Sequence, residues 1–291
     1  MKTLDGLLKE GIAVLEASGN VEARLDAWLL LEYVTKITRA YFYAHMSEEV
    51  TEETEKYYHE LCEKRAQHIP LQHLTNQAFF MGYEFFVNEH VLIPRQDTEV
   101  LVEEAEKRLQ TMENPKILDM CTGSGCILLS ILADMEKVHG IGVDISEEAL
   151  KVAEKNAENL QVSERVQFIE SNLFSGVFFS EKDGNDTGSY DILISNPPYI
   201  PTKEIEELME EVRFHDPRLA LDGHEDGLYF YRIITEESIK YLKPGGWLLY
   251  EIGCSQGEDV SRLLRDAGFE NIAVVKDLPG LDRVVLGQRP F

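Results

Sequence analysis

The sequence is poor in features that would point to a secreted, metal-binding or membrane protein. Among its 291 residues are only four cysteines, Cys62, Cys121, Cys126 and Cys254, and none of them forms a CxxC pair. Cysteines this sparse exclude a disulfide framework, and no second cysteine or histidine pair accompanies Cys121 and Cys126. We therefore expect no metal site. No apolar run reaches the roughly 18 residues that a membrane-spanning helix needs, so no membrane association is expected.

The N-terminal segment also lacks the pattern of a secretory signal. Residues 1–19 read MKTLDGLLKEGIAVLEASG and carry acidic residues within the apolar pattern. A secretory signal instead has a basic start followed by an unbroken apolar centre. This difference favours a cytoplasmic location.

Basic residues are scarce as well. The chain has 53 acidic residues against 28 lysines and arginines, which gives a formal net charge of −25, and no Lys/Arg cluster is present. Neutralisation of phosphates drives binding to duplex DNA, so direct DNA binding is not expected. A basic protein surface is the more plausible macromolecular partner.

The length and the 44% hydrophobic content fit two folded domains. Apolar residues recur at helical spacing through residues 1–75, for example Leu4, Leu7 and Leu8, and Pro70 is expected to end the last of these helices. This pattern predicts an N-terminal helical domain, to which the family resemblance given below assigns substrate recognition. Residues 76–95, rich in strand formers around Gly82, predict a β-hairpin linker. Asp97 is then expected to cap a helix that carries Val100 and Leu101.

Residues 96–291 alternate short apolar runs with amphipathic helices such as 147–160 and 259–267. This alternation predicts a Rossmann-like, parallel α/β domain. The polar segment Glu181–Ser189 is expected to be an exposed loop. The expected strands are Ile117–Met120, Gly140–Val143, Val166–Ile169, Ile192–Ser195, Trp247–Ile252, Ile272–Val275 and Val284–Leu286.

A glycine-rich turn follows the first of these strands and precedes an apolar helix. Glycine lets a backbone approach a ligand closely, and an acid at the end of the next strand, Asp144, can accept both hydroxyls of a ribose. The pattern is GxG rather than GxGxxG, because Leu128 occupies the third glycine position, and this argues against a dinucleotide. With Asp119 at the strand end, it is similar to S-adenosylmethionine-dependent methyltransferases. The residues expected to bind this cofactor are Cys121, Thr122, Gly123, Ser124, Gly125, Asp144, Asn172, Leu173 and Asn196.

In related methyltransferases an acidic residue often follows the third strand and receives the adenine amino group. This chain has Asn172 there, followed by Leu173. The amide oxygen of Asn172 can still accept that hydrogen bond.

The most specific motif is Asn196-Pro197-Pro198-Tyr199, directly after the fourth expected strand. Neither proline has an N–H, and each favours an extended residue before it, so the loop presents acceptors and no neighbouring donors. Such a loop suits a planar –NH₂ group, with Tyr199 offering a face for stacking. We expect Asn196, Pro197 and Tyr199 to be catalytic, and all four residues to bind the substrate. Positioning can supply much of the rate, and the sequence contains no evident general base.

Several segments together resemble the release factor glutamine methyltransferases (the PrmC/HemK family). The likeness extends over nearly the whole chain, although this family usually has proline at the position of Gln96. It implies that S-adenosyl-L-methionine methylates the glutamine of a Gly-Gly-Gln loop in class 1 peptide release factors, and that Asn196 and the Pro197 carbonyl hold the glutamine amide. The segments that carry the resemblance are 22–27, 91–99, 196–199, 216–223, 243–246, 251–253 and 282–287.

The Asn-Pro-Pro-Tyr motif alone leaves other substrates open. It also occurs in adenine N6 methyltransferases that act on DNA, and a ribosomal-protein glutamine methyltransferase would share the same pocket. The negative charge disfavours the nucleic acid. Arg95 is expected to brace the junction between the domains, against Glu99 or Asp97, or else to form an ordinary surface salt bridge.

Overall fold

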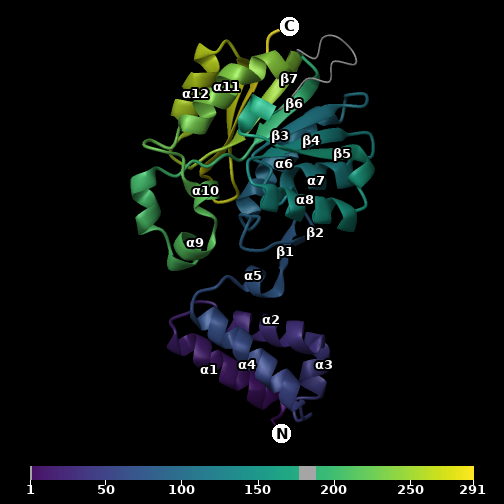
Figure 1. The fold of residues 1–291 in the computed structure, drawn as a ribbon, viewed down its shortest axis with the longest axis vertical. Helices are drawn as coiled ribbons and strands as arrows, with labels where there is room; N and C mark the ends of the chain where they lie inside the picture. Colours follow the sequence, from purple (N-terminus) through teal and green to yellow (C-terminus); the bar gives the residue numbers. More distant parts are fainter. Residues whose placement is uncertain (1, 177–187) are drawn as a thin grey trace. The chain divides into compact units, whose positions relative to one another are not determined.

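The computed structural model describes residues 2–176 and 188–291, in two compact units. One unit comprises Met1–Gln77 and Met209–His215, and the other comprises Ala78–Leu208 and Asp216–Phe291 (Figure 1). The expected loop Glu181–Ser189 lies outside the described residues except for its last two positions. The domain boundaries after residues 75 and 95 remain predictions.

The first unit is a helical bundle, and three of its helices, α1, α3 and α4, begin at threonine caps. The side chains of Thr3, Thr38 and Thr51 each accept a backbone N–H in the first turn of the helix that follows. The helices are α1 Leu4–Ala17, α2 Ala23–Thr35, α3 Arg39–Ala44, α4 Glu52–Ala66, α5 Leu71–Thr75 and α9 Glu210–His215. The expectation that Pro70 ends a helix is wrong, since α4 ends at Ala66 and Pro70 instead stands at the start of α5, where its missing N–H has no cost.

A buried arginine ties α9 to the rest of this bundle. Arg65, on α4, donates to Asp26 on α2 over 2.7 Å and to Glu211 on α9 over 2.9 Å. The arginine and Asp26 side chains are both less than one-tenth exposed. This pairing joins the short segment 209–215, far along the chain, to the helical unit.

The expected β-hairpin is present. Strands β1 (Gln77–Phe80) and β2 (Tyr83–Phe86) form a two-stranded sheet, and Met81 and Gly82 between them both have positive φ angles. A two-residue turn with two positive φ angles matches the twist of paired strands. Phe80 and Phe85 are fully buried among helix and strand residues of the second unit.

All seven strands expected in the second unit are confirmed, in the order β5-β4-β3-β6-β7-β9-β8. The expectation of a parallel sheet is wrong at one edge, because β9 runs antiparallel to both β7 and β8. A short connection between β8 and β9 allows this pairing, whereas a parallel pair would need a crossover. The strands are β3 Lys116–Met120, β4 His139–Asp144, β5 Val166–Glu170, β6 Tyr190–Ser195, β7 Leu242–Glu251, β8 Glu270–Lys276 and β9 Asp282–Gln288.

Helices cover both faces of this sheet (Figure 1). Helices α6 (Glu99–Leu109), α7 (Cys126–Asp134) and α8 (Glu147–Asn159) contribute to one buried cluster, together with Ile117 and Ile192 of the sheet. Helices α11 (Tyr229–Tyr241) and α12 (Gly257–Asp266) contribute to the other, against Leu118 and Leu193. Adjacent strand residues thus point to opposite faces, and both faces are buried.

The remaining turns of helix are short. Asp97 lies inside one of them and does not cap α6, whose first residue follows Thr98; instead its carboxylate pairs with Arg283 at 3.3 Å. The expected capping role of Asp97 is therefore wrong. These turns are η1 Gln96–Thr98, η2 Ser163–Arg165, η3 Leu173–Gly176, η4 Thr202–Glu207 and α10 Arg218–Leu221.

The strand order creates a natural binding position. From β3 the chain passes to β4 on one side, and later enters β6 on the other side. Met120 and Ser195 are paired at the carboxyl ends of β3 and β6. In open α/β sheets, ligands bind beyond the strand ends at such a reversal of strand order.

Candidate active site

The glycine-rich turn between β3 and α7 has an unusual backbone. Cys121, Gly123 and Gly125 all have positive φ angles, of 63°, 55° and 79°. At Gly123 a Cβ would meet no atom within 4 Å, so the backbone there faces open space. The left-handed conformation is uncommon for a non-glycine residue, which marks Cys121 as a strained position of the kind found at binding sites.

Two carboxyl groups hold this turn. Asp144 Oδ2 accepts the N–H of Gly123 at 2.9 Å, and its Oδ1 accepts the N–H of Ser146 at 3.0 Å. Asp119 is fully buried and accepts the hydroxyl of Thr122 at 2.5 Å, while its second oxygen has no partner among the described residues. The turn is therefore ordered by the two acids that the sequence analysis singled out.

Burial shifts the titration of both acids. It raises the pKa of Asp119 to about 7, against the hydrogen bond from Thr122, and the nearby charge of Asp144 adds to the rise. Burial also raises the pKa of Asp144, although the N–H groups of Ser146 and Gly123 stabilise its charged form. Titratable groups perturbed by burial in this way are typical of binding and catalytic sites.

Asn156, which belongs to none of the sequence motifs, connects the turn to the hairpin. Its side chain is fully buried and donates to the carbonyl of Ser124 at 2.9 Å and to the carbonyl of Phe86 at 3.0 Å. It also accepts the N–H of Phe86 at 2.7 Å. An asparagine on an otherwise apolar helix face was the only available signal, and it says nothing about its partners.

The Asn-Pro-Pro-Tyr loop follows β6 and is held from both ends. Ser195 donates its hydroxyl to the carbonyl of Met120 at 2.6 Å, and the side chain of Gln256 donates to the carbonyl of Tyr199 at 3.0 Å. Gly227 approaches the same carbonyl so closely that a Cβ there would lie 2.3 Å from it. Glycine at 227 is thus required by close packing as well as by its positive φ angle of 73°.

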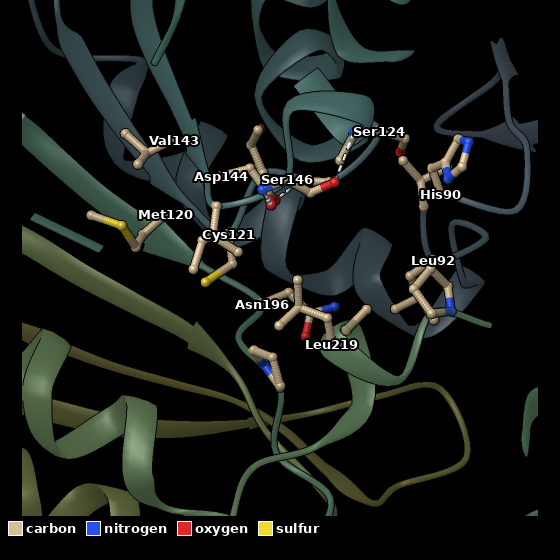
Figure 2. A pocket seen from close by; sticks show the side chains of 18 of the residues that line it. His90, Leu92, Met120, Cys121, Ser124, Val143, Asp144, Ser146, Asn196 and Leu219 are labelled. Atoms are coloured by element: carbon tan, nitrogen blue, oxygen red, sulfur yellow. Dashed lines mark hydrogen bonds between the residues drawn. The ribbon is translucent and has the colours of Figure 1, made fainter. Parts of the chain in front are cut away.

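A single cavity of about 490 Å³ joins the glycine-rich turn to this loop. Figure 2 shows the side chains of Cys121, Asp144 and Asn196 around it, although they come from three different strand ends. The volume is in the range of small-molecule sites, which are concave and mostly apolar with a few polar groups. The arrangement can therefore hold a nucleoside-sized ligand next to a second group at Asn196.

Most of the expected site residues line this cavity. Residues that do so are Cys121, Thr122, Gly123, Ser124, Asp144, Asn172, Leu173, Asn196 and Pro198. The lining does not include Gly125, Pro197 or Tyr199. Tyr199 instead packs against the second buried cluster, and burial raises the pKa of its phenol. The expected stacking of Tyr199 on a substrate stays a prediction.

Two further segments, which belong to neither of the two motifs, also line the cavity. One precedes α6 and includes His90 and Leu92, and the other includes Leu219, His224 and Tyr229 (Figure 2 labels three of these five). Both lie in segments noted in the sequence or adjacent to them. The two segments are far apart in the sequence, and only the tertiary fold brings them to the same cavity.

The sequence led us to expect that Arg95 pairs with Glu99 or Asp97. In the structure it pairs with neither of them. It donates to Asp216 over 2.7 Å, and that carboxyl side chain is 1% exposed. Glu99 accepts the N–H of Met81, and Asp97 faces Arg283. Since Arg95 and the neighbouring Pro217 both line the cavity, this pair fastens one part of its wall.

Within residues 2–176 and 188–291, no group of three or more histidine, cysteine or acidic side chains is arranged to hold a metal ion. Over the same part of the chain, no helix has the length and apolar character needed to cross a membrane.

Comparisons with known proteins cover both units. Residues 6–75 match the family model described as the PrmC N-terminal domain, and residues 112–258 match a methyltransferase domain. The chain is 39% identical over 289 residues to a release factor glutamine methyltransferase from Clostridium acetobutylicum, with 99% of each chain covered. It is 40% identical over 273 residues to the protein of that name from Caulobacter vibrioides, with 94% and 92% covered.

Among solved structures, the catalytic domain of hMettl16, in complex with MAT2A 3'UTR hairpin 6, has the same fold. It aligns with a TM-score of 0.57 at 16% identity, covering 80% of this chain and 82% of that one.

Proposed function

Because the chain belongs to the family of release factor glutamine methyltransferases, we propose that it methylates the side-chain amide nitrogen of a glutamine. The methyl donor is S-adenosyl-L-methionine and the product is S-adenosyl-L-homocysteine. The acceptor is the glutamine of the Gly-Gly-Gln loop in class 1 peptide release factors. The observation that carries this proposal is the one cavity shared by the glycine-rich turn and Asn196.

The residues around the turn fit the cofactor. Gly123 leaves space for a ligand against its backbone, and each oxygen of Asp144 retains a lone pair after accepting one N–H. Such a carboxylate suits a ribose, and Asn172 with Leu173 suits the adenine end of the same nucleoside. When bound, the cofactor supplies an activated methyl group on a sulfonium.

The chain's own contribution is to orient the acceptor. An amide nitrogen is a poor nucleophile because its lone pair is delocalised. The side-chain oxygen of Asn196 and the carbonyl of Pro197, which lies between the lining residues Asn196 and Pro198, would accept its two N–H groups. This arrangement favours a more localised lone pair. Holding the nitrogen in line with the methyl group lowers the activation barrier, because the reacting atoms are already positioned. Such positioning can lower the barrier by roughly 7–11 kcal/mol.

The helical unit supports recognition of a whole protein. Four of the acids near the start of α4, Glu48, Glu49, Glu52 and Glu53, are exposed and could face a basic partner. Glu55, which the sequence places with them, pairs with Lys2 at 3.2 Å and is less available. We place the reaction in the cytoplasm, where translation takes place.

Methyl transfer from labelled cofactor to purified release factors, ribosomal proteins and duplex DNA, assayed in parallel, tests the proposal. We expect label in the release factor and none in a factor whose Gly-Gly-Gln glutamine is replaced by alanine. Equal labelling of that variant would place the methyl group elsewhere. Label confined to a ribosomal protein, or to DNA, would replace the release factor as substrate.

A further inference from the structure

A buried carboxyl group lies directly behind the Asn-Pro-Pro-Tyr loop. Glu251 is the last residue of β7, which runs parallel to β6, and Ser195 is paired with Tyr250. The next residues along the two strands, Asn196 and Glu251, therefore lie side by side where the strands end. Glu251 is only 3% exposed and does not line the cavity itself.

The backbone around Glu251 is firmly held. The hydroxyl of Tyr231, itself fully buried, donates to the carbonyl of Glu251 at 2.8 Å. On the other side, Glu251 is paired with Val284 of β9. Since the main chain is fixed by two elements, the carboxyl group has little freedom to move away from Asn196.

The polar neighbours of this carboxyl group are mostly donors. Hydrogen bonding from the side chains of Thr98 and Asn196 lowers the pKa of this carboxyl group, as does the positive charge of Arg283. Within the described residues, the Oε2 atom of Glu251 has no hydrogen-bond partner. The other titratable groups that face it are Asp97, Tyr199, Tyr231 and Cys126.

An asparagine amide has two chemically different ends. Its oxygen only accepts hydrogen bonds and its –NH₂ only donates. If the –NH₂ of Asn196 faces a carboxylate, the oxygen is directed away from it, toward the cavity. The reversed amide would bring two acceptors together, an arrangement that a buried site strongly disfavours.

We propose that Glu251 is a positioning residue that holds the Asn196 amide with its oxygen facing the cavity. This inference rests on the proposed function, in which that oxygen accepts an N–H of the substrate amide. Glu251 itself touches neither the substrate nor the cofactor. It acts by removing the unproductive orientation of Asn196 before the substrate arrives.

The orientation depends on the charge of the carboxyl group, so it depends on pH. Burial raises the pKa of Glu251 to about 7, with Asp97 adding to the rise and Thr98, Arg283 and Asn196 opposing it. Below this pKa the group is neutral and its hold on the amide weakens. Turnover at saturating cofactor should therefore rise with pH through about 7 and level off above it.

The first test needs no substrate. In protein with ¹⁵N-labelled asparagine, the side-chain –NH₂ signal of Asn196, assigned by its loss in Asn196→Ala, is followed from pH 5 to pH 9. We expect an inflection near pH 7 in the wild type and none in Glu251→Gln. A signal that does not move, or that moves equally in both proteins, overturns the proposal.

Glu106→Gln is the matched control. Burial and Asp134 raise the pKa of Glu106 to about 7 as well, but Glu106 lies on α6 and does not line the cavity. This variant removes a carboxyl group of the same pKa at another place. It should keep the Asn196 inflection and near-normal turnover.

The second test is kinetic. Glu251→Gln should lower kcat at least about tenfold at pH 8, because small misplacements of reacting groups are costly, with the cofactor Kd and the KM for the release factor changed less than about twofold. Glu251→Asp should recover part of the loss, since it keeps the charge. An unchanged kcat in Glu251→Gln, or a loss shared equally by the cofactor Kd, contradicts a positioning role.

The two tests separate this inference from the proposed function. If wild-type protein methylates no release factor but the Asn196 inflection is present and absent in Glu251→Gln, the proposed function fails and the pairing stands. If the factor is methylated but no inflection appears, the pairing fails and the function stands. Should Glu251→Gln not fold, the wild-type titration and Glu251→Asp decide.

Discussion

The carboxylate of Asp144, at the end of β4, accepts the backbone N–H of Gly123 over 2.9 Å. The acid thus orders the glycine-rich turn and also faces the cavity. Asp144 therefore has two roles in the proposed cofactor site. It fixes the backbone of the glycine-rich turn, and its oxygens can accept hydrogen bonds from a ribose.

Asp144→Ala should therefore weaken cofactor binding. Losing a charge-assisted, two-point contact costs on the order of 1.5–3 kcal/mol, or about 10- to 150-fold in affinity. Isothermal titration calorimetry measures the change. Asp144→Asn, which keeps the shape and one oxygen, should lose less than Asp144→Ala, and wild-type affinity in the alanine variant would remove Asp144 from the site.

Asn196→Ala should slow turnover far more than it destabilises the protein. We expect kcat to fall by at least about 100-fold, by analogy with the loss of one group that stabilises a transition state. The melting temperature should change little, because Asn196 is only partly buried and lies in a loop. Near-normal turnover of the alanine variant would exclude the amide-holding mechanism.

The buried carboxyl of Asp119 should make stability depend on pH. Its folded pKa, raised to about 7 by burial, exceeds the unfolded value near 3.8, so the folded state binds the proton more tightly. Its contribution to stability therefore falls as pH rises from about 4 to about 7, and is constant above that. Asp119→Asn keeps an acceptor for Thr122 and removes the titration. The melting temperature of the variant, relative to that of the wild type, should increase from pH 5 to pH 8. A difference in melting temperature that does not change with pH would contradict the assignment.

Duplex DNA should be neither bound nor methylated. The formal charge of −25 opposes the approach of a polyanion, and no basic cluster is available to release counterions. Gel-shift and methylation assays at low salt give binding its best chance. Efficient methylation under those conditions would restore the adenine alternative.

Recognition should require an intact factor rather than a short Gly-Gly-Gln peptide. The cavity holds one side chain and its immediate surroundings, so selectivity for one protein must come from contacts elsewhere. Reversing two exposed charges, in Glu52→Lys/Glu53→Lys, should raise the KM for the factor roughly threefold or more while leaving the slow reaction with peptide unchanged.

The matched control for that variant is Glu113→Lys/Glu136→Lys, which changes the net charge equally at two exposed acids of the other unit. Equal KM values for the two double variants would show that only the total charge matters. In that case the helical unit would not be the recognition surface.

Local sequence patterns were sufficient to predict many of the secondary-structure elements and both motifs of this protein. Buried strands read as short apolar runs between helices, so all seven strands of the sheet followed from the sequence, as did the hairpin with its turn at Gly82. The glycine-rich turn and the Asn-Pro-Pro-Tyr loop were also recognisable, because glycine and proline restrict the backbone in ways that depend only on neighbouring residues.

Tertiary structure decided which strands and which charged side chains pair across long distances in the sequence. The antiparallel entry of β9 depends on which strand edge remains open. Arg95 pairs with Asp216, 121 residues away, rather than with the acids beside it, and Asp97 pairs with Arg283 rather than capping α6. Charged side chains are long and bind whichever opposite charge the fold brings near, so proximity in sequence predicts their partners poorly.

Glu251 shows the same limit at the site itself. In the sequence it is an acid at the end of an apolar run, 55 residues after Asn196, with no motif relating the two. Only the pairing of β6 with β7 brings them side by side, and only burial of both strand ends raises the pKa of that carboxyl group. Residue types and backbone restraints are local properties that a sequence determines, whereas burial and long-range contact exist only once the chain has folded.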